Sequence, residues 1–316
     1  MVNNGWLIID KPLGLSSTQV VGKVRRGLNV KKLGHIGTLD PLATGVLVVA
    51  LGEATKLIPY MPTGPKVYEF DVRWGESRDT DDAEGKVIHQ CQVYPTLLSI
   101  NAVIPQFLGQ IDQVPPIYSA IKTQGQPAYK AARKGETPVM KTRQVMIHDL
   151  YVVEMIDEQT TRFQVKCGGG TYVRSLARDL AIHLGTYGYV HSLRRLQDGL
   201  FGIQDTISLE KILEIGHKSE DYSLLRPIEA VLDDIPAVLV SADDAQKIRQ
   251  GMDIRCDLKT DTRDEHPVAL FFEGNLLAIA VFEEQRLRPR RVFNLTIQKY
   301  KGLYDVDFCR TQTRSY

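Results

Sequence analysis

The sequence predicts an α/β protein of mixed α+β type, in which helices flank a largely antiparallel mixed sheet and a small β-rich domain follows. Helix and strand patterns occur in mixed order rather than in the strict βαβ succession of a parallel sheet. Near residue 236 the pattern changes to short apolar strands. We therefore expect two domains, residues 1–235 and residues 236–316. The 316 residues are 43% hydrophobic and 24% charged, which suits globular domains that bury a core.

The first sixty residues predict two buried strands with a helix between them, and then a shorter helix. The runs WLIID and VLVVAL are apolar enough for interior strands. Ser16 or Ser17 can cap the first helix, and EATKLIPYM ends before Pro62, which cannot continue a helix. The apolar positions of the first helix fall on one face: Val20, Val21, Val24 and Leu28.

The clearest strand pattern is KVYEFDVRW, residues 66–74, whose side chains alternate between two faces. Tyr68, Phe70, Val72 and Trp74 share the apolar face. Farther along, TYVRSLARDLAIHLG has helical periodicity and ends at Gly185. Helices are also predicted in PTLLSINAVIPQFLGQ and AYKAARKG, and strands in YSAIK, RQVMIHDLYVVEMID, RFQVKC and VHSLRRLQDGLFGI.

The region after residue 236 predicts the small β-rich domain, and acidic helical segments precede it at residues 209–215 and 227–232. SADDAQKIRQG begins with a capping serine and predicts a short helix. VALFFEGNLLAIAVFE predicts two strands around a Glu-Gly-Asn turn, and RVFNL predicts another strand.

Composition argues against several classes of protein. No apolar run reaches the roughly 18 residues that span a bilayer, and the N-terminus lacks the features of a signal peptide. We therefore expect a cytoplasmic protein without a membrane partner. The four cysteines stand singly, with no CxxC pair and no histidine at ligand spacing. This arrangement predicts reduced thiols rather than disulfides or a metal site.

Charge is balanced overall but clustered locally. The net charge is +1, yet residues 11–32 contain six Lys or Arg and no acid, and residues 286–301 repeat this composition. Such basic faces on a neutral protein suit a partner that is held through its phosphates. Ordinary solvated surface charge is the alternative, and the pattern alone does not decide between them.

The stretch GHIGTLDPLATGVL, residues 34–47, contains a single acid, Asp40. Pro41 disfavours the helical conformation at Asp40, and Gly34, Gly37 and Gly45 allow sharp bends or a close approach to a ligand. Asp40 can therefore either shape a turn or take part in chemistry. Taken alone, the stretch favours the turn-shaping role.

Two further segments suggest charged sites. In GGGTYVRSL, Arg174 falls in the first turn of a predicted helix, where a cation is unfavourable unless it has a specific anionic partner; a solvent-facing arginine is the alternative. The glycines lack the spacing of a phosphate-binding loop. ESRDTDDAEGKV carries five acids, but their spacing does not match a calcium loop, so we expect no metal there.

Six motifs in order along the chain resemble those of TruB-type tRNA pseudouridine-55 synthases. Together they extend from about residue 5 to residue 196, roughly two thirds of the chain. The C-terminal third matches more loosely, and the resemblance implies a PUA-like RNA-binding domain there. The motifs are DKPLGLSS, GHIGTLDPLATGVLVVALGEATK, KVYEFDVRWGESRDTDDAEG, PPIYSAIKTQGQPAYKAARKG, CGGGTYVRSLARDLAIHLG and HSLRRL.

The resemblance implies a pseudouridine-synthase fold and an isomerase. Such an enzyme flips the T-loop uridine out of tRNA, breaks its N1–C1′ bond, turns the base and joins C5 to C1′. Neither a metal nor another cofactor is implied. The expected partner is the T-arm stem-loop of tRNA, bound by a monomer.

The resemblance also assigns roles to residues of this sequence. The expected catalytic residues are Asp40, the catalytic carboxylate, Arg174 beside it, and Tyr68, which also stacks on the flipped base, although core packing is a rival role for Tyr68. The remaining expected substrate-binding residues are Tyr172, Leu193, His35, Lys11 and Lys122, with residues 129–134 gripping the T arm. One position departs from the family pattern: Ile36 stands where the family has a threonine.

Two other functions remain open at this stage. A non-catalytic RNA-binding protein could use the same scaffold, in which case Asp40 would be dispensable. A metal-dependent nuclease could use the acids of residues 76–84.

Overall fold

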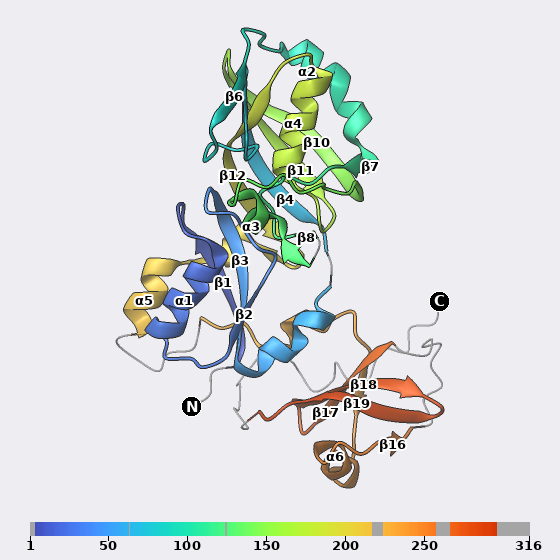
Figure 1. Ribbon diagram of the computed structural model, residues 1–316. Helices are drawn as coiled ribbons and strands as arrows, with labels where there is room; N and C mark the ends of the chain where they lie inside the picture. Colours follow the sequence, from blue (N-terminus) through green and yellow to red (C-terminus); the bar gives the residue numbers. More distant parts are fainter. Residues whose placement is uncertain (1–3, 63, 124, 217–223, 257–265, 296–316) are drawn as a thin grey trace.

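A ten-stranded mixed sheet forms the centre of the protein. The computed structural model describes residues 4–62, 64–123, 125–216, 224–256 and 266–295. Figure 1 shows the sheet with helices packed beside it. Its strands are β1 (Gly5–Lys11), β2 (Leu33–Ile36), β3 (Ala43–Leu51), β4 (Lys66–Trp74), β7 (Gly109–Gln113), β10 (Arg143–Asp157), β11 (Thr160–Cys167), β12 (Gly188–Asp198), β13 (Phe201–Gly202) and β14 (Ile207–Ser208).

The strand order is β14-β1-β3-β12-β4-β11-β10-β7, with β2 beside β3 and β13 beside β12. Only the pairs β1–β14 and β3–β12 are parallel within the described sheet. The prediction of a largely antiparallel mixed sheet is therefore confirmed. Two short ribbons lie outside it, β5 (Glu76–Arg78) with β6 (Val87–Gln90), and β8 (Lys122–Thr123) with β9 (Gln126–Pro127).

The helices follow the predicted positions closely. Ser16 caps α1, accepts from the amide of Gln19 and completes a capping box with that residue. The apolar face of α4 is buried, and Gly185 follows the helix in a left-handed conformation. The helices are α1 (Ser17–Gly27), η1 (Gly52–Tyr60), α2 (Leu97–Val103), η2 (Ile104–Phe107), α3 (Ala128–Ala132), α4 (Val173–His183), η3 (Ile203–Asp205), α5 (Leu209–Gly216), η4 (Ile228–Val231) and α6 (Ala242–Arg249).

The two faces of the main sheet belong to different cores. One core lies between the sheet and helices α1 and α4, and it contains the predicted apolar face of β4: Tyr68, Phe70, Val72 and Trp74. The opposite face of β1 and β3 forms a second core, to which Trp6 contributes. Trp6 also donates its indole N–H to the carbonyl of Ile228, 3.0 Å away. No helix in the described ranges is long and apolar enough to cross a membrane.

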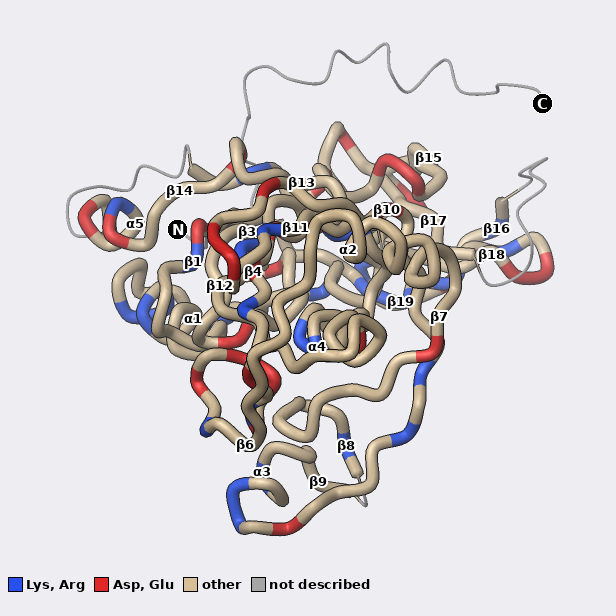
Figure 2. The backbone as a smooth tube through the Cα atoms, turned by 90° about the horizontal axis from the view of Figure 1, so that it is seen from above, with Lys and Arg blue, Asp and Glu red and all other residues tan. Residues whose placement is uncertain are grey.

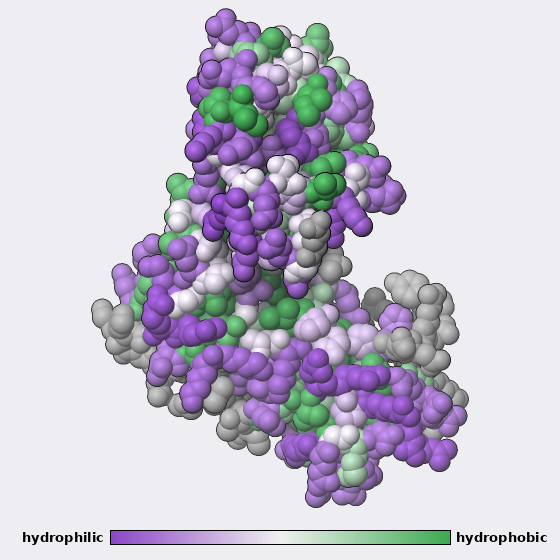
Figure 3. All heavy atoms as spheres, viewed as in Figure 1, coloured by the Kyte–Doolittle hydropathy of each residue, from purple (hydrophilic) through white to green (hydrophobic). Residues whose placement is uncertain are grey.

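A second, five-stranded sheet follows residue 236. Its order is β15 (Ala237–Leu239), β17 (Pro267–Phe272), β18 (Asn275–Glu283), β19 (Arg286–Val292) and β16 (Ile254–Arg255). Ile279 on β18 and Phe293, which follows β19, belong to the same core as Trp6, so the two sheets are joined by apolar packing. The domain boundary at residue 236 and the PUA-like character stay predictions. The face shown in Figure 3 is mainly hydrophilic, with apolar groups on the upper lobe.

One predicted strand was wrong. In YSAIK, residues 118–122, the first three residues form bends, and a strand begins only at Lys122. The carbonyls of this segment are occupied elsewhere: Tyr118 accepts from the Arg174 guanidinium at 3.0 Å, and Ser119 accepts from the amide of Tyr129 at 3.0 Å. Of the strand predicted in RVFNL, residues 291–295, the first two residues lie in β19, which ends at Val292, and residues 293–295 are not in a strand. Lys299 and Lys301 of the C-terminal basic cluster lie outside the described residues.

Candidate active site

The loop that carries Asp40 connects β2 to β3 and is held through its backbone. The buried Ser17 hydroxyl accepts from the amide of Leu39 at 2.8 Å and donates to its carbonyl at 3.0 Å. The carbonyl of Pro41 accepts from the amide of Gly14 at 2.9 Å, and the carbonyl of Asp40 accepts from Ala43 at 3.1 Å. These bonds give the loop a defined shape independent of the Asp40 side chain.

Asp40 forms an ion pair with Arg174 across 134 residues of sequence. The distance from Nη2 of Arg174 to Oδ2 of Asp40 is 2.8 Å, and the side chains are 5% and 39% exposed, respectively. The arginine is thus a buried, fixed cation, whereas the carboxylate keeps an open side. The structure therefore places Asp40 and Arg174 next to each other, as the family resemblance predicted.

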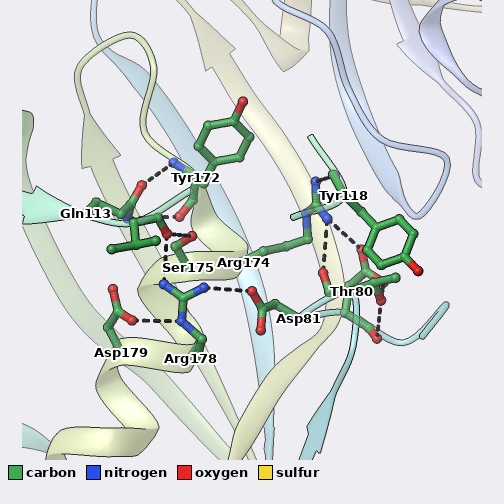
Figure 4. A network of polar contacts seen from close by, with 11 residues as sticks. Thr80, Asp81, Gln113, Tyr118, Tyr172, Arg174, Ser175, Arg178 and Asp179 are labelled. Atoms are coloured by element: carbon green, nitrogen blue, oxygen red, sulfur yellow. Dashed lines mark hydrogen bonds and ion pairs between the residues drawn. The ribbon is translucent and has the colours of Figure 1, made fainter. Parts of the chain in front are cut away.

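Arg174 is fixed by partners other than Asp40. Its Nη1 donates to the carbonyl of Thr80 and its Nη2 to the carbonyl of Tyr118, each at 3.0 Å. Figure 4 shows Arg174 extending from α4 to these two residues. Because a planar guanidinium with several bonds has one orientation, the cation can hold Asp40 in one place.

Asp82 is a second carboxylate at Arg174 that the sequence analysis did not single out. It is 2% exposed and lies 3.5 Å from Nη1 of Arg174. Burial raises the pKa of Asp82, while the Thr80 hydroxyl, 2.5 Å away, and Arg174 favour its charged form. Two features of the sequence could have identified this contact. Arg174 stands in the first turn of a helix, where a cation is unfavourable without an anionic partner. The acids of residues 76–84 do not have the spacing of a calcium loop and were therefore available as that partner.

The acidic loop of residues 76–84 supplies counter-charges to helix α4. Arg178 contacts Asp81 and Asp179, each at 2.9 Å, as Figure 4 shows, and also donates to the carbonyl of Val114. The amide of Lys86 donates to Asp79 at 2.8 Å. Among the described residues, no group of three or more His, Cys, Asp or Glu is placed to hold a metal.

Tyr68 and Leu193 form part of the apolar core next to the loop that carries Asp40. Tyr68 on β4 is 7% exposed and Leu193 on β12 is 9% exposed. Burial raises the pKa of Tyr68 to about 12, so its hydroxyl is neutral at physiological pH. Leu193 on β12 is paired with Ala43, the first residue of β3. Ala43 follows Asp40 by three residues, so Leu193 lies near the end of the Asp40 loop. Both the core role and a role against a base are compatible with these positions.

The other predicted substrate-binding residues lie at different depths. Tyr172 precedes α4, and its backbone amide and carbonyl are both bonded to the side chain of Gln113. His35 lies on β2, and its buried Nδ1 has no hydrogen-bond partner within the described residues. Lys122 is exposed on the β8–β9 ribbon, and no contact with Asp40 or Arg174 is found for it in the described structure.

Lys11 is buried beneath the Asp40 loop. Its side chain is fully buried, and its ammonium donates to the carbonyls of Leu15, Pro12 and Pro41 at 2.5, 2.9 and 3.4 Å. Burial lowers the pKa of Lys11 to about 8, although the carboxylate of Asp40 opposes this shift. These contacts favour a role in holding the loop, while the predicted substrate contact of Lys11 stays a prediction.

The unexpected Ile36 has a structural explanation. It pairs with Val48 in the β2–β3 ladder and packs against the second core, together with Ile58 and Met61. An apolar side chain at this position therefore extends the core next to the loop.

The fold is that of a pseudouridine synthase. A chain from an H/ACA ribonucleoprotein bound to a substrate RNA containing 2′-deoxyuridine superposes with a TM-score of 0.68 over 93% of this chain and 86% of its own, at 21% identity. A chain from a Cbf5–Nop10–Gar1 complex also gives 0.68, over 92% and 85%, at 22% identity. The predicted fold class is confirmed.

Sequence relatives give the family. Residues 25–173 match the TruB family pseudouridylate synthase, N-terminal domain. A protein of Rhodospirillum rubrum named tRNA pseudouridine synthase B is 46% identical over 92% of this chain and 97% of its own length. One from Ruegeria pomeroyi with the same name is 44% identical over 92% and 95%. The chain belongs to the TruB family of pseudouridine synthases, as its motifs predicted.

We predict that Lys11 makes stability depend on pH. Its pKa falls from an ordinary 10.5 to about 8 in the folded protein, so between these values the unfolded chain binds more protons and stability rises with pH. From pH 7 to pH 9.5, the free energy of unfolding of wild type should rise relative to Lys11→Met by on the order of 1–2 kcal/mol. Urea denaturation at both pH values measures this difference. A difference that stays constant would contradict the assignment.

Proposed function

We propose that this protein converts the T-loop uridine at position 55 of tRNA to pseudouridine, with Asp40 as the catalytic carboxylate. The observation that carries the proposal is the ion pair between Asp40, which is partly exposed on a loop held through its backbone, and the buried Arg174 of α4, 2.8 Å away. Family membership supports an isomerase, and relatives named tRNA pseudouridine synthase B support tRNA as the substrate. A cytoplasmic location and a monomeric state stay predictions from the sequence.

The chemistry requires an anion beside the sugar. Loss of the base develops positive charge at C1′, which a carboxylate can stabilise or trap covalently. The Asp40 side chain is 39% exposed, while the buried Arg174 pairs with its Oδ2. Because Arg174 is fixed by the carbonyls of Thr80 and Tyr118, the carboxylate is oriented before the substrate arrives.

The base needs an apolar surface once it leaves the RNA stack. Flipping a nucleotide costs a few kcal/mol, which contacts in the pocket must offset. Tyr68 and Leu193 supply ring and aliphatic surface from neighbouring strands, since Leu193 is in register with Phe70 on β4. Tyr172 stands two residues before Arg174, and His35 lies on the strand that enters the loop.

The RNA backbone needs cations near the loop. Helix α1 and the segment after it expose Lys23, Arg25, Arg26, Lys31 and Lys32, and Figure 2 shows this basic group beside α1. A second group is at α3, where Lys130, Arg133 and Lys134 follow one another closely. By contrast, Arg286, Arg288 and Arg290 on β19 form ion pairs with Asp253 or Glu283. We therefore assign the T-arm contact to the α1 and α3 groups.

Replacing Asp40 by Asn should abolish turnover and leave RNA binding nearly intact. Tritium release from a T-arm stem-loop labelled at C5 of the target uridine should fall at least about 1000-fold, because an amide cannot trap or neutralise the charge at C1′. Asp10→Asn is the matched control: Asp10 is 33% exposed and pairs with Arg194 at 2.8 Å. Activity in Asp40→Asn equal to that of the control would favour a non-catalytic RNA-binding protein.

Removing the Arg174 side chain should separate catalysis from binding. We expect Arg174→Ala to reduce kcat about 100-fold or more with a change of only a few fold in the Kd for tRNA, because the arginine is buried and faces Asp40. Single-turnover kinetics and filter binding with the same stem-loop measure the two effects. Equal losses in kcat and affinity would show that Arg174 is a phosphate contact instead.

Neutralising the α3 group should change the salt dependence of binding. The triple variant Lys130→Ala, Arg133→Ala, Lys134→Ala should weaken tRNA binding and lower the slope of log affinity against log salt by about one for each phosphate that the variant no longer neutralises. Lys166→Ala, exposed on β11, serves as a control with the slope of wild type. An unchanged slope in the triple variant would remove α3 from the RNA-binding surface.

A further inference from the structure

Arg195 is a second buried arginine next to the Asp40 loop. It is 1% exposed, and its position on β12 is in register with Gly45 of β3 on one side and with Tyr68 of β4 on the other. One residue is thus adjacent both to the end of the loop that carries Asp40 and to the tyrosine proposed to contact the base.

The guanidinium of Arg195 bonds to the backbone both before and after Asp40 in the sequence. Nη2 donates to the carbonyl of Gly37 at 2.8 Å, three residues before Asp40, and Nε donates to the carbonyl of Val46 at 2.7 Å, six residues after it. The same cation also faces two side chains proposed to contact RNA. Burial has the largest effect on the pKa of each, lowering that of His35 and raising that of Tyr68, and the charge of Arg195 lowers both.

Asp198 provides the counter-charge for Arg195. Its side chain is 5% exposed, and its Oδ2 lies 3.2 Å from Nη1 of Arg195, which stands three residues earlier on β12. Lys66, at the start of β4, binds the other carboxylate oxygen. A buried guanidinium without this carboxylate would cost several kcal/mol, so the pair acts as a unit.

Two glycines show how closely the loop is packed against Arg195. A Cβ at Gly37, where φ is +63°, would lie 2.8 Å from both Nη1 of Arg195 and Oδ2 of Asp198. A Cβ at Gly45 would lie 2.2 Å from the carbonyl oxygen of Arg195. The approach to Gly37 therefore leaves no room for any side chain between the loop and the ion pair.

We propose that Arg195 and Asp198 are a positioning pair for the reaction, which sets the place of the Asp40 loop relative to Tyr68. The inference rests on the proposed function of Asp40. Arg174 fixes the carboxylate itself, whereas Arg195 fixes the backbone before and after it. Displacement of the pair moves the loop away from β4 without removing any group that contacts the substrate.

A positioning role and a purely structural role differ in what a folded variant does. Loss of core stability lowers the melting temperature, but the folded fraction keeps the kcat of wild type. Loss of position lowers kcat in fully folded protein, because a misplacement of about 1 Å at reacting groups can cost up to 100-fold. KM for the stem-loop should stay nearly constant, since the basic groups on α1 and α3 are unaffected.

The first test compares Gly37→Ala with Gly185→Ala. Both residues have similar positive φ values, +63° and +69°, but a Cβ at Gly185 meets nothing within 4 Å. At a temperature where circular dichroism shows both variants folded, we expect Gly37→Ala to lose about 10- to 100-fold in kcat for tritium release, with KM within a few fold. Gly185→Ala should keep the kcat of wild type. Equal kcat in the two variants would overturn the proposal.

The second test uses Arg195→Lys alone and combined with Gly37→Ala. A lysine can keep the charge but cannot bond Gly37, Val46 and Asp198 together, so kcat should fall in Arg195→Lys as well. If the alanine at residue 37 acts by displacing the guanidinium, the double variant should lose little more than either single variant. Losses that multiply would show that Gly37→Ala acts through backbone strain alone and would overturn the proposal.

Asp40→Asn distinguishes failure of this inference from failure of the proposed function. An inactive Asp40→Asn together with fully active Gly37→Ala and Arg195→Lys would reject the positioning pair and leave the catalytic role of Asp40 in place. A fully active Asp40→Asn would reject the proposed function first.

Discussion

The geometry of the site depends on the contacts that the buried Arg174 guanidinium makes. A charge that is only 5% exposed is stable only when several partners neutralise and bond it. Those partners come from three separate segments, at Asp40, at Thr80 and Asp82, and at Tyr118. The loop, the acidic segment and the bends before β8 must therefore converge on α4 before Asp40 obtains its counter-charge.

The two carboxylates at Arg174 differ in a way that suits different tasks. Asp82 is 2% exposed and has the Thr80 hydroxyl and the Glu84 amide as further partners. Asp40 is 39% exposed and keeps one side free of the arginine. Asp82 can offset the cost of burying the guanidinium, while Asp40 is the carboxylate that remains accessible for the proposed reaction. This division explains why one arginine at the start of a helix is accompanied by two acids.

Local sequence patterns predicted the strands and helices well because alternation and capping depend on near neighbours. The alternation of residues 66–74 became the buried face of β4, and Ser16 became the cap of α1. Charged contacts were harder to predict. The pairing of Asp40 with Arg174 came only from the family resemblance, and the contacts of Asp82 and Lys11 were missed. Burial of a charge depends on segments that meet only in the folded chain, so local spacing does not encode it.

Three buried cations contact the Asp40 loop, and two of them bind its backbone. Lys11 binds the carbonyl of Pro41, and Arg195 binds the carbonyls of Gly37 and Val46. Of these three cations, Arg174 is the one that pairs with the Asp40 carboxylate in the described part of the chain. The position of the loop and the charge that it presents are consequently set by different residues. A change of the carboxylate alone leaves the backbone contacts in place, so the chemistry of Asp40 can be separated experimentally from the placement of the loop.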